Sequence, residues 1–191
     1  MFLRKAALRP VPPWAVVDEV ALDALESSLG EDDEALQQVL DAGYREMDRL
    51  QPHLAEWLAG EVSGETDELA QSVGYFLVVT VYLAFREAFP TRLDAVDEAA
   101  LSIALETLEA DEALRAADPT EVYESDDVVA MGQPALLAYV QHHFDEAVSQ
   151  ADGSPDLDAF DAVYRAILVE VIALSHAVRA PDERAQSRIL A

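Results

Sequence analysis

Apolar residues recur at steps of three and four over nearly the whole chain beyond residue 16, and no segment shows sustained alternation. Steps of three or four keep apolar side chains on one face of an α-helix, whereas a half-buried strand needs a step of two. Clear stripes of this kind begin at Leu36, Leu54, Leu93 and Leu136. The chain is therefore expected to be all-α.

Cap residues predict where these helices begin and end. Gly30 and Gly64 stand where helices are expected to stop. Thr91, followed three residues later by Asp94, has the form of a capping box, and residues 154–156 (Ser-Pro-Asp) combine a cap, a first-turn proline and a first-turn acid. These signals predict a compact bundle of about eight helices, near 17–29, 32–50, 52–62, 66–89, 92–116, 120–131, 134–150 and 155–179, with a short helix near 182–190.

The first sixteen residues differ from the rest because they contain three prolines. We expect residues 1–16 to form an irregular arm and residues 17–191 to form a single helical domain. The longest largely apolar run, at 73–85, is shorter than the roughly 20 residues of a membrane span, so it predicts a buried helix and no membrane contact. The N-terminus turns polar too soon for a secretory signal, so a cytoplasmic protein is expected.

A motif recurs at Gln51-Pro52 and Gln133-Pro134. Each copy is followed by apolar residues at the same four positions and then by a long, very apolar helix. A proline at the first helical position fixes the entry angle of the helix. The recurrence predicts a tandem duplication, although Gln-Pro at a helix start also arises by chance. The halves would span about 32–89 and 120–179, with central apolar helices near 66–89 and 155–179.

The charge of the chain restricts its partners. Asp and Glu number 38 against 12 Lys and Arg, which gives a formal net charge of −26. Contact with phosphate backbones or anionic membranes needs basic clusters, so neither nucleic acid nor an anionic membrane is an expected ligand. Adaptation to a salt-rich cytoplasm, where repulsion is screened, and a surface for a basic partner both remain open. The acids are spread over all the predicted helices, which favours adaptation.

Glu170 is the best single candidate for a catalytic residue. Its neighbours three and four positions away on the predicted helix are all apolar. Burial of a carboxyl group raises its pKa, which is how proteins make general acids and bases. The simpler interpretation is structural pairing, and the candidate partners are Arg86, Arg165, Thr80 and Tyr82.

A divalent metal site is considered because His53 and His143 are each followed three residues later by a glutamate, Glu56 and Glu146. Residues three apart share a helix face, so each pair could supply two ligands. Helical di-metal proteins use the reverse order, Glu-x-x-His, which this chain lacks, so solvated ion pairs are favoured. No cofactor is expected. The candidate metal ligands are Glu170, His176, His143 and Glu146.

The stretch from Asp67 to Leu77 resembles the metal-binding helix of all-α nucleotide pyrophosphohydrolases. That family carries an acid three residues after its glutamate, whereas Gln71 stands three residues after Glu68 in this chain. The resemblance covers only this stretch, and no activity is assigned from it.

No catalytic motif, glycine-rich phosphate loop or cysteine is present in the sequence. The sequence therefore favours a non-enzymatic protein-binding or scaffolding module that acts on a protein partner or as a homodimer. A first alternative is a metal-assisted hydrolase that uses carboxylates inside the bundle, Glu170 among them. A second is an acidic decoy of a nucleic-acid-binding protein, which would gather its acids on one face.

Overall fold

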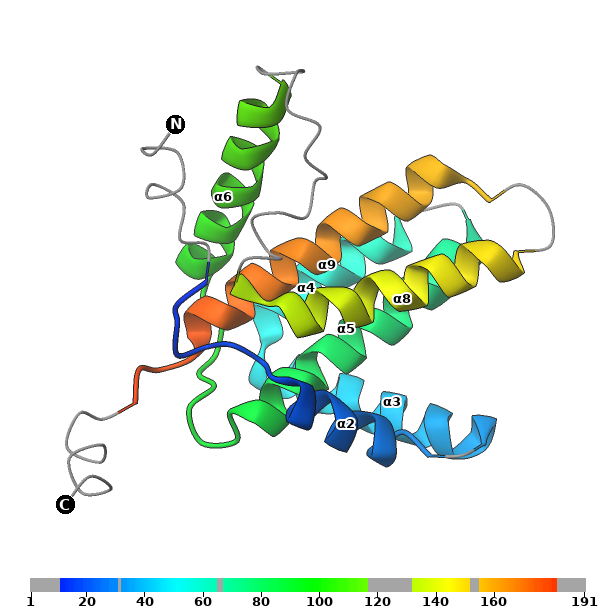
Figure 1. The fold of residues 1–191 in the computed structure, drawn as a ribbon, viewed down its shortest axis with the longest axis horizontal. Coiled ribbons are helices and arrows are strands. Elements are labelled where there is room, and N and C mark those ends of the chain that lie inside the picture. The colour runs from blue at the N-terminus through cyan, green and yellow to red at the C-terminus, as the bar shows by residue number, and fades with distance from the viewer. Residues whose placement is uncertain (1–10, 31, 65–66, 117–131, 152–154, 182–191) are drawn as a thin grey trace.

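The computed structural model describes residues 11–30, 32–64, 67–116, 132–151 and 155–181, and these residues form an all-α bundle (Figure 1). They contain no strand, only an isolated β-bridge between Leu93 and Val178. Their helices are α2 (Glu19–Ser28), α3 (Asp33–Leu50), α4 (Pro52–Ser63), α5 (Glu68–Ala88), α6 (Glu98–Ala116), α8 (Pro134–Gln150) and α9 (Leu157–Ala177).

One predicted boundary is wrong by six residues. The helix expected to begin near residue 92 begins at Glu98, and Asp97 rather than Thr91 caps it through a side-chain hydrogen bond of 2.7 Å. Asp94, expected in the capping box, instead donates its backbone N–H to the carbonyl of Ala177 at 3.0 Å. The segment before α6 is thus an extended connection held against the end of α9.

Some predicted elements lie beyond the residues that the structure describes. These are the helices near 120–131 and 182–190 and the first ten residues of the expected arm. Residues 11–18 are irregular and lead directly into α2.

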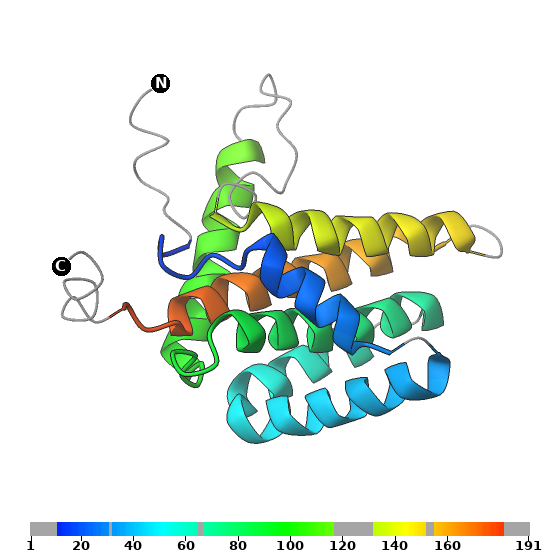
Figure 2. The ribbon, with the colours of Figure 1, turned by 60° about the horizontal axis from the view of Figure 1, so that its bottom comes forward.

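The long helices α5 and α9 form the centre of the bundle. They are in more extensive contact than any other pair of described helices and run side by side in Figure 2. α3 and α8 lie on opposite sides of this pair in Figure 2, whereas α6 packs mainly on α9 and projects from the bundle in Figure 1. Burial of apolar side chains on both central helices is the main source of stability.

α5 is, among the described helices, the one long and apolar enough to cross a membrane by length and composition. Its most apolar 18-residue window has a mean hydropathy of 1.4, and 56% of that window is buried inside the bundle. The core helix of a soluble protein has the same properties, so the composition of α5 does not distinguish a core helix from a membrane span.

The two Gln-Pro motifs make the same hydrogen bonds. Each glutamine donates from its side-chain nitrogen to one backbone carbonyl and accepts at its side-chain oxygen from the N–H two residues further on. Gln51 does so with Asp94 and Val96, at 2.9 and 2.6 Å, and Gln133 with Ala15 and Val17, at 2.5 and 2.8 Å. The backbone angles also agree, at φ −130°, ψ 51° and φ −134°, ψ 58°. We call these two arrangements the glutamine clamps.

α5 and α9 also begin in the same way. Asp67 and Asp156 each cap their helix by accepting from the backbone N–H groups two and three residues further on. Asp156 is thus the cap of α9 rather than the first-turn acid that the sequence predicts. The N–H of Asp156 lies 3.4 Å from a carboxylate oxygen of Asp67, so the two central helices start side by side.

A glycine allows α5 to approach its neighbours closely. A Cβ atom at Gly74 would lie 2.8 Å from Cγ1 of Val163 and 2.9 Å from Cγ1 of Val62. We expect Gly74→Ala to lower the free energy of unfolding by about 1 kcal/mol, because overpacking outweighs the gain in helix propensity. Gly60→Ala is the control: no atom lies within 4 Å, so a gain of about 0.5 kcal/mol is expected. Urea denaturation measures both, and equal changes would contradict close packing at Gly74.

Candidate functional site

Glu170 lies in the second half of α9 and has no exposed surface. The residues three and four positions away are all buried and apolar, namely Ala166, Ile167, Ala173 and Leu174. Neither carboxyl oxygen has a hydrogen-bond partner within the described residues. Burial raises the pKa of Glu170 well above its usual value, which favours the protonated carboxyl. The group is thus a carboxyl enclosed in an apolar core, where its neutral form is favoured.

The partners predicted for Glu170 are engaged elsewhere. Both arginines form ion pairs with other glutamates: Arg165 binds Glu112 at 2.9 Å, and Arg86 binds Glu46. The hydroxyl of Tyr82 donates to Glu46 at 3.3 Å, and the hydroxyl of Thr80 donates to the carbonyl of Leu77 at 3.3 Å. The prediction that one of them pairs with Glu170 is therefore wrong. The physical reason is that both arginine side chains leave the core and reach half-exposed carboxylates on α6 and α3, where their charge stays hydrated.

The histidines predicted as metal ligands do not join Glu170. His176 is exposed near the end of α9, whereas Glu170 is buried. His53 and Glu56 are exposed on α4. Within the ranges that the structure describes, no three His, Asp or Glu residues are placed to hold one metal ion.

His143 packs as an aromatic ring. Its Nδ1 lies 4.0 Å from a carboxylate oxygen of Glu146, and its ring contacts those of Phe76 and Tyr139 edge-to-face at centroid distances of 4.9 and 4.5 Å. Burial lowers the pKa of His143, so the uncharged imidazole is favoured. Ring packing therefore contributes more than the ion pair at this position.

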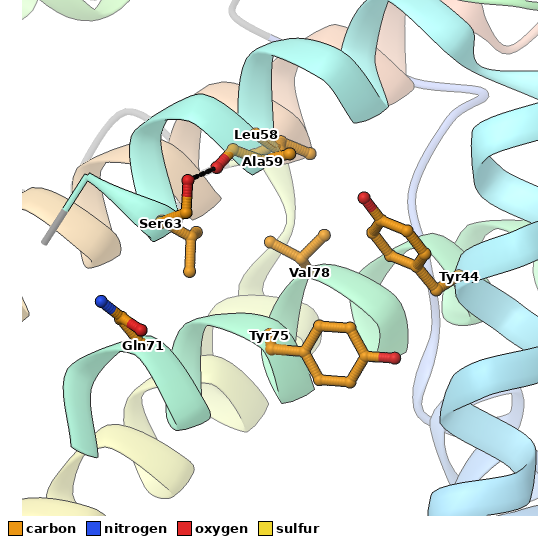
Figure 3. Close-up of a pocket in the computed structure, with 8 residues that line it drawn as sticks. Tyr44, Leu58, Ala59, Ser63, Gln71, Tyr75 and Val78 are labelled. Atoms are coloured by element: carbon orange, nitrogen blue, oxygen red, sulfur yellow. Dashed lines mark hydrogen bonds between the residues drawn. The ribbon is translucent and has the colours of Figure 1, made fainter. Parts of the chain in front are cut away.

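A cavity of about 310 Å³ that opens to solvent lies between α3, α4 and α5 (Figure 3). Its walls include Tyr44 of α3, Leu58 and Val62 of α4, and Gln71, Tyr75 and Val78 of α5. The rings of Tyr44 and Tyr75 lie 5.7 Å apart and form an aromatic wall. The Tyr75 hydroxyl donates to Asp41 at 3.4 Å, and burial and the Asp41 charge raise the pKa of Tyr75. No carboxylate, amine, guanidinium or imidazole group lines this cavity.

Sequence reasoning missed this cavity because its residues are ordinary members of apolar helix stripes. A sequence signal becomes visible only when spacings are compared. Val62 follows Gln51 as Phe144 follows Gln133, and Gln71 follows Asp67 as Phe160 follows Asp156.

Large apolar side chains are exposed at the start of the described chain. Trp14, Val16 and Val20 are 42%, 40% and 74% exposed, whereas Ala15 and Val17 between them are buried. The Trp14 indole donates to the carbonyl of Val178 at 3.0 Å, which fixes the ring against the end of α9. We call Trp14, Val16 and Val20 the N-terminal apolar segment.

The chain matches no protein-family model, no curated protein and no solved structure.

Proposed function

We propose that the protein is a non-enzymatic helical module of the cytoplasm that binds another protein chain. The observation that carries this proposal is the N-terminal apolar segment, in which a hydrogen-bonded tryptophan is 42% exposed. Tryptophan is among the residues that contribute most to protein–protein affinity, and a ring already held in place loses little entropy on binding.

The charge near this segment favours a basic partner. Asp18, Glu19 and Asp23 are exposed beside Val20, and the whole chain carries −26. A partner with an apolar centre and a rim of lysine and arginine complements such a surface, whereas a second copy of this chain is repelled. We therefore favour a basic protein, rather than a second copy of this chain, as the partner.

The proposal is tested by substitution at the N-terminal apolar segment. Binding partners captured from lysate of the source cells are compared for the wild type and for Trp14→Ser/Val20→Ser. We expect basic proteins to be enriched on the wild type and lost from the double variant. Leu157→Ser, at a leucine that is 65% exposed on α9, is the matched control and should leave capture unchanged.

Self-association is measured separately by sedimentation in about 0.1 and 1 M KCl, since salt screens the repulsion between copies. A dimer that the double variant abolishes would replace the basic partner with a second copy of the chain. Identical capture by the wild type and the double variant, with no dimer, would overturn the proposal.

We also propose that the chain arose by tandem duplication, with halves longer than the Gln-Pro motifs alone suggest. The two glutamine clamps have matching geometry, and each clamped segment continues as Val-Asp-Glu, at 17–19 and 96–98, with the aspartate capping the next helix. The caps of α5 and α9 match as well. These correspondences support halves of about 15–89 and 94–178.

A further inference from the structure

We propose that the cavity between α3, α4 and α5 binds a small, uncharged and largely apolar molecule. Its volume of about 310 Å³ lies at the lower end of the usual range for small-molecule sites. The site is distinct from the N-terminal apolar segment, so the proposal goes beyond protein binding.

The corresponding positions of the second half carry larger side chains. Val62 follows Gln51 by the same number of residues as Phe144 follows Gln133. Gln71 follows its helix cap, Asp67, as Phe160 follows Asp156.

These two phenylalanines meet between α8 and α9. The ring of Phe144 lies 6.0 Å from that of Phe160 and 5.1 Å from that of Tyr164, which corresponds to Tyr75. The second half therefore fills with aromatic rings the space that Val62 and Gln71 leave open in the first half.

Apolar side chains that line an open pocket stay in contact with water, whereas a larger residue in the pocket would cover them and add to stability. The second half shows that this helix pair accommodates phenylalanine at both positions. A chain selected for stability alone would fill the first half in the same way. We infer that the open space in the first half is retained for a ligand.

The lining defines the chemistry of the ligand. No charged side chain lines the cavity, so an ionic group would be buried without a counter-ion, and the overall charge of −26 repels anions further. The rings of Tyr44 and Tyr75, tilted by 41° to each other, give the wall an aromatic surface on which an apolar molecule can pack. Figure 3 marks no hydrogen bond between Tyr44 and the other lining residues, and the Tyr44 hydroxyl can donate to an acceptor on the ligand.

The test uses two fluorescent probes that share one ring system. N-phenyl-1-naphthylamine is uncharged, and 8-anilino-1-naphthalenesulfonate adds a sulfonate. We expect the uncharged probe to bind the full chain with one-to-one stoichiometry and the sulfonate to bind at least about tenfold more weakly. Both titrations are run in about 1 M KCl, so that repulsion at a distance is screened and the lining itself is compared.

The site is located by variants that carry the residues found at the corresponding positions of the second half. Val62→Phe/Gln71→Phe should reduce binding of N-phenyl-1-naphthylamine by about tenfold or more without lowering Tm. Leu69→Phe adds an aromatic ring to α5 outside the cavity and should leave binding unchanged. Ala59→Gln, at an exposed cavity position that corresponds to Gln141, should weaken binding even if the double variant does not fold.

Failure of the wild type to bind the uncharged probe, or equal binding by the wild type and Ala59→Gln, would overturn the proposed site. If the variants block binding but the wild type binds both probes with equal affinity, the site exists and the proposal that its ligand is uncharged is wrong. These outcomes are independent of Trp14 and Val20, so they are distinguishable from a failure of the proposed protein interface.

Discussion

Replacement of Glu170 by leucine is expected to raise the free energy of unfolding by about 2 kcal/mol at pH 7. The carboxyl is fully buried, and no described residue forms a hydrogen bond with it, so folding removes its hydration without compensation. A leucine keeps the apolar contacts and removes this cost. For a domain of this size the change corresponds to a rise in Tm of about 4–8 °C.

The gain should depend on pH, and its sign follows from the raised pKa. The pKa of a glutamate in an unfolded chain is about 4.3, whereas burial raises the pKa of Glu170 in the folded protein well above that value. Between these two values the folded state holds a proton that the unfolded state has released. The stability of the wild type therefore falls as pH rises through this window, by up to about 1.4 kcal/mol per pH unit from this group.

Urea denaturation of the wild type and Glu170→Leu from pH 4 to pH 8 isolates this contribution, because every other carboxyl is common to both proteins. The difference should be small near pH 4 and grow towards pH 8. Glu56→Leu, at an exposed glutamate of α4, is the control and should show no such growth. A lower stability of Glu170→Leu at neutral pH would mean that the buried carboxyl has a favourable partner, and the interpretation of an uncompensated acid would be abandoned.

The fold class and most helix boundaries were predictable because they depend on local pattern. Apolar steps of three and four predict the helices, and the prolines at 52 and 134 stand at the first helical position as expected. The error before α6 arises because Thr91 and Asp94 have capping chemistry, whereas Thr91 lies in a turn and pairing with the distant end of α9 keeps Leu93 and Asp94 extended. A contact between residues so far apart in sequence overrides a local signal of about 1 kcal/mol.

The candidate sites were predictable only where the surroundings of a side chain are set by residues of its own helix. The apolar surroundings of Glu170 follow from its neighbours on α9, so its burial could be predicted. The side-chain directions of Arg86 and Arg165 depend on the helices that face them, so the sequence could not predict their partners. The cavity depends on the sizes of side chains from three helices, so the apolar pattern of any one helix does not predict it.

Gln133→Ala is expected to lower the free energy of unfolding by about 4 kcal/mol. The side chain is fully buried and bonds the Ala15 carbonyl, the Val17 N–H and, at 3.0 Å, the Ser175 hydroxyl. Its loss leaves the Ala15 carbonyl and the Val17 N–H unpaired, at roughly 1–3 kcal/mol each when no water replaces the bond, whereas the Ser175 hydroxyl keeps its bond to the Val171 carbonyl. Gln51→Ala, which lacks a third bond of this kind among the described contacts, should cost about 3 kcal/mol.

Urea denaturation gives these two free energies, and hydrogen exchange shows where each acts. Gln133→Ala should speed exchange at the Val17 amide, and Gln51→Ala at the Val96 amide, each leaving the other amide protected. Gln37→Ala removes an exposed 2.8 Å bond to Asp41 and should change stability by less than about 0.5 kcal/mol. If the clamp variants lower the free energy of unfolding by no more than Gln37→Ala does, the glutamine clamps do not stabilise the fold.

The pattern of these effects bears on how distant parts of the chain depend on each other. Gln51 precedes α4 yet holds the segment that leads into α6, and Gln133 precedes α8 yet holds the segment that leads into α2. Each glutamine thus supplies hydrogen bonds to a segment that enters a helix far away in the sequence. Because a buried N–H or carbonyl without a partner is costly, loss of either clamp is expected to loosen the helix entry that it holds as well as the start of the helix that it precedes.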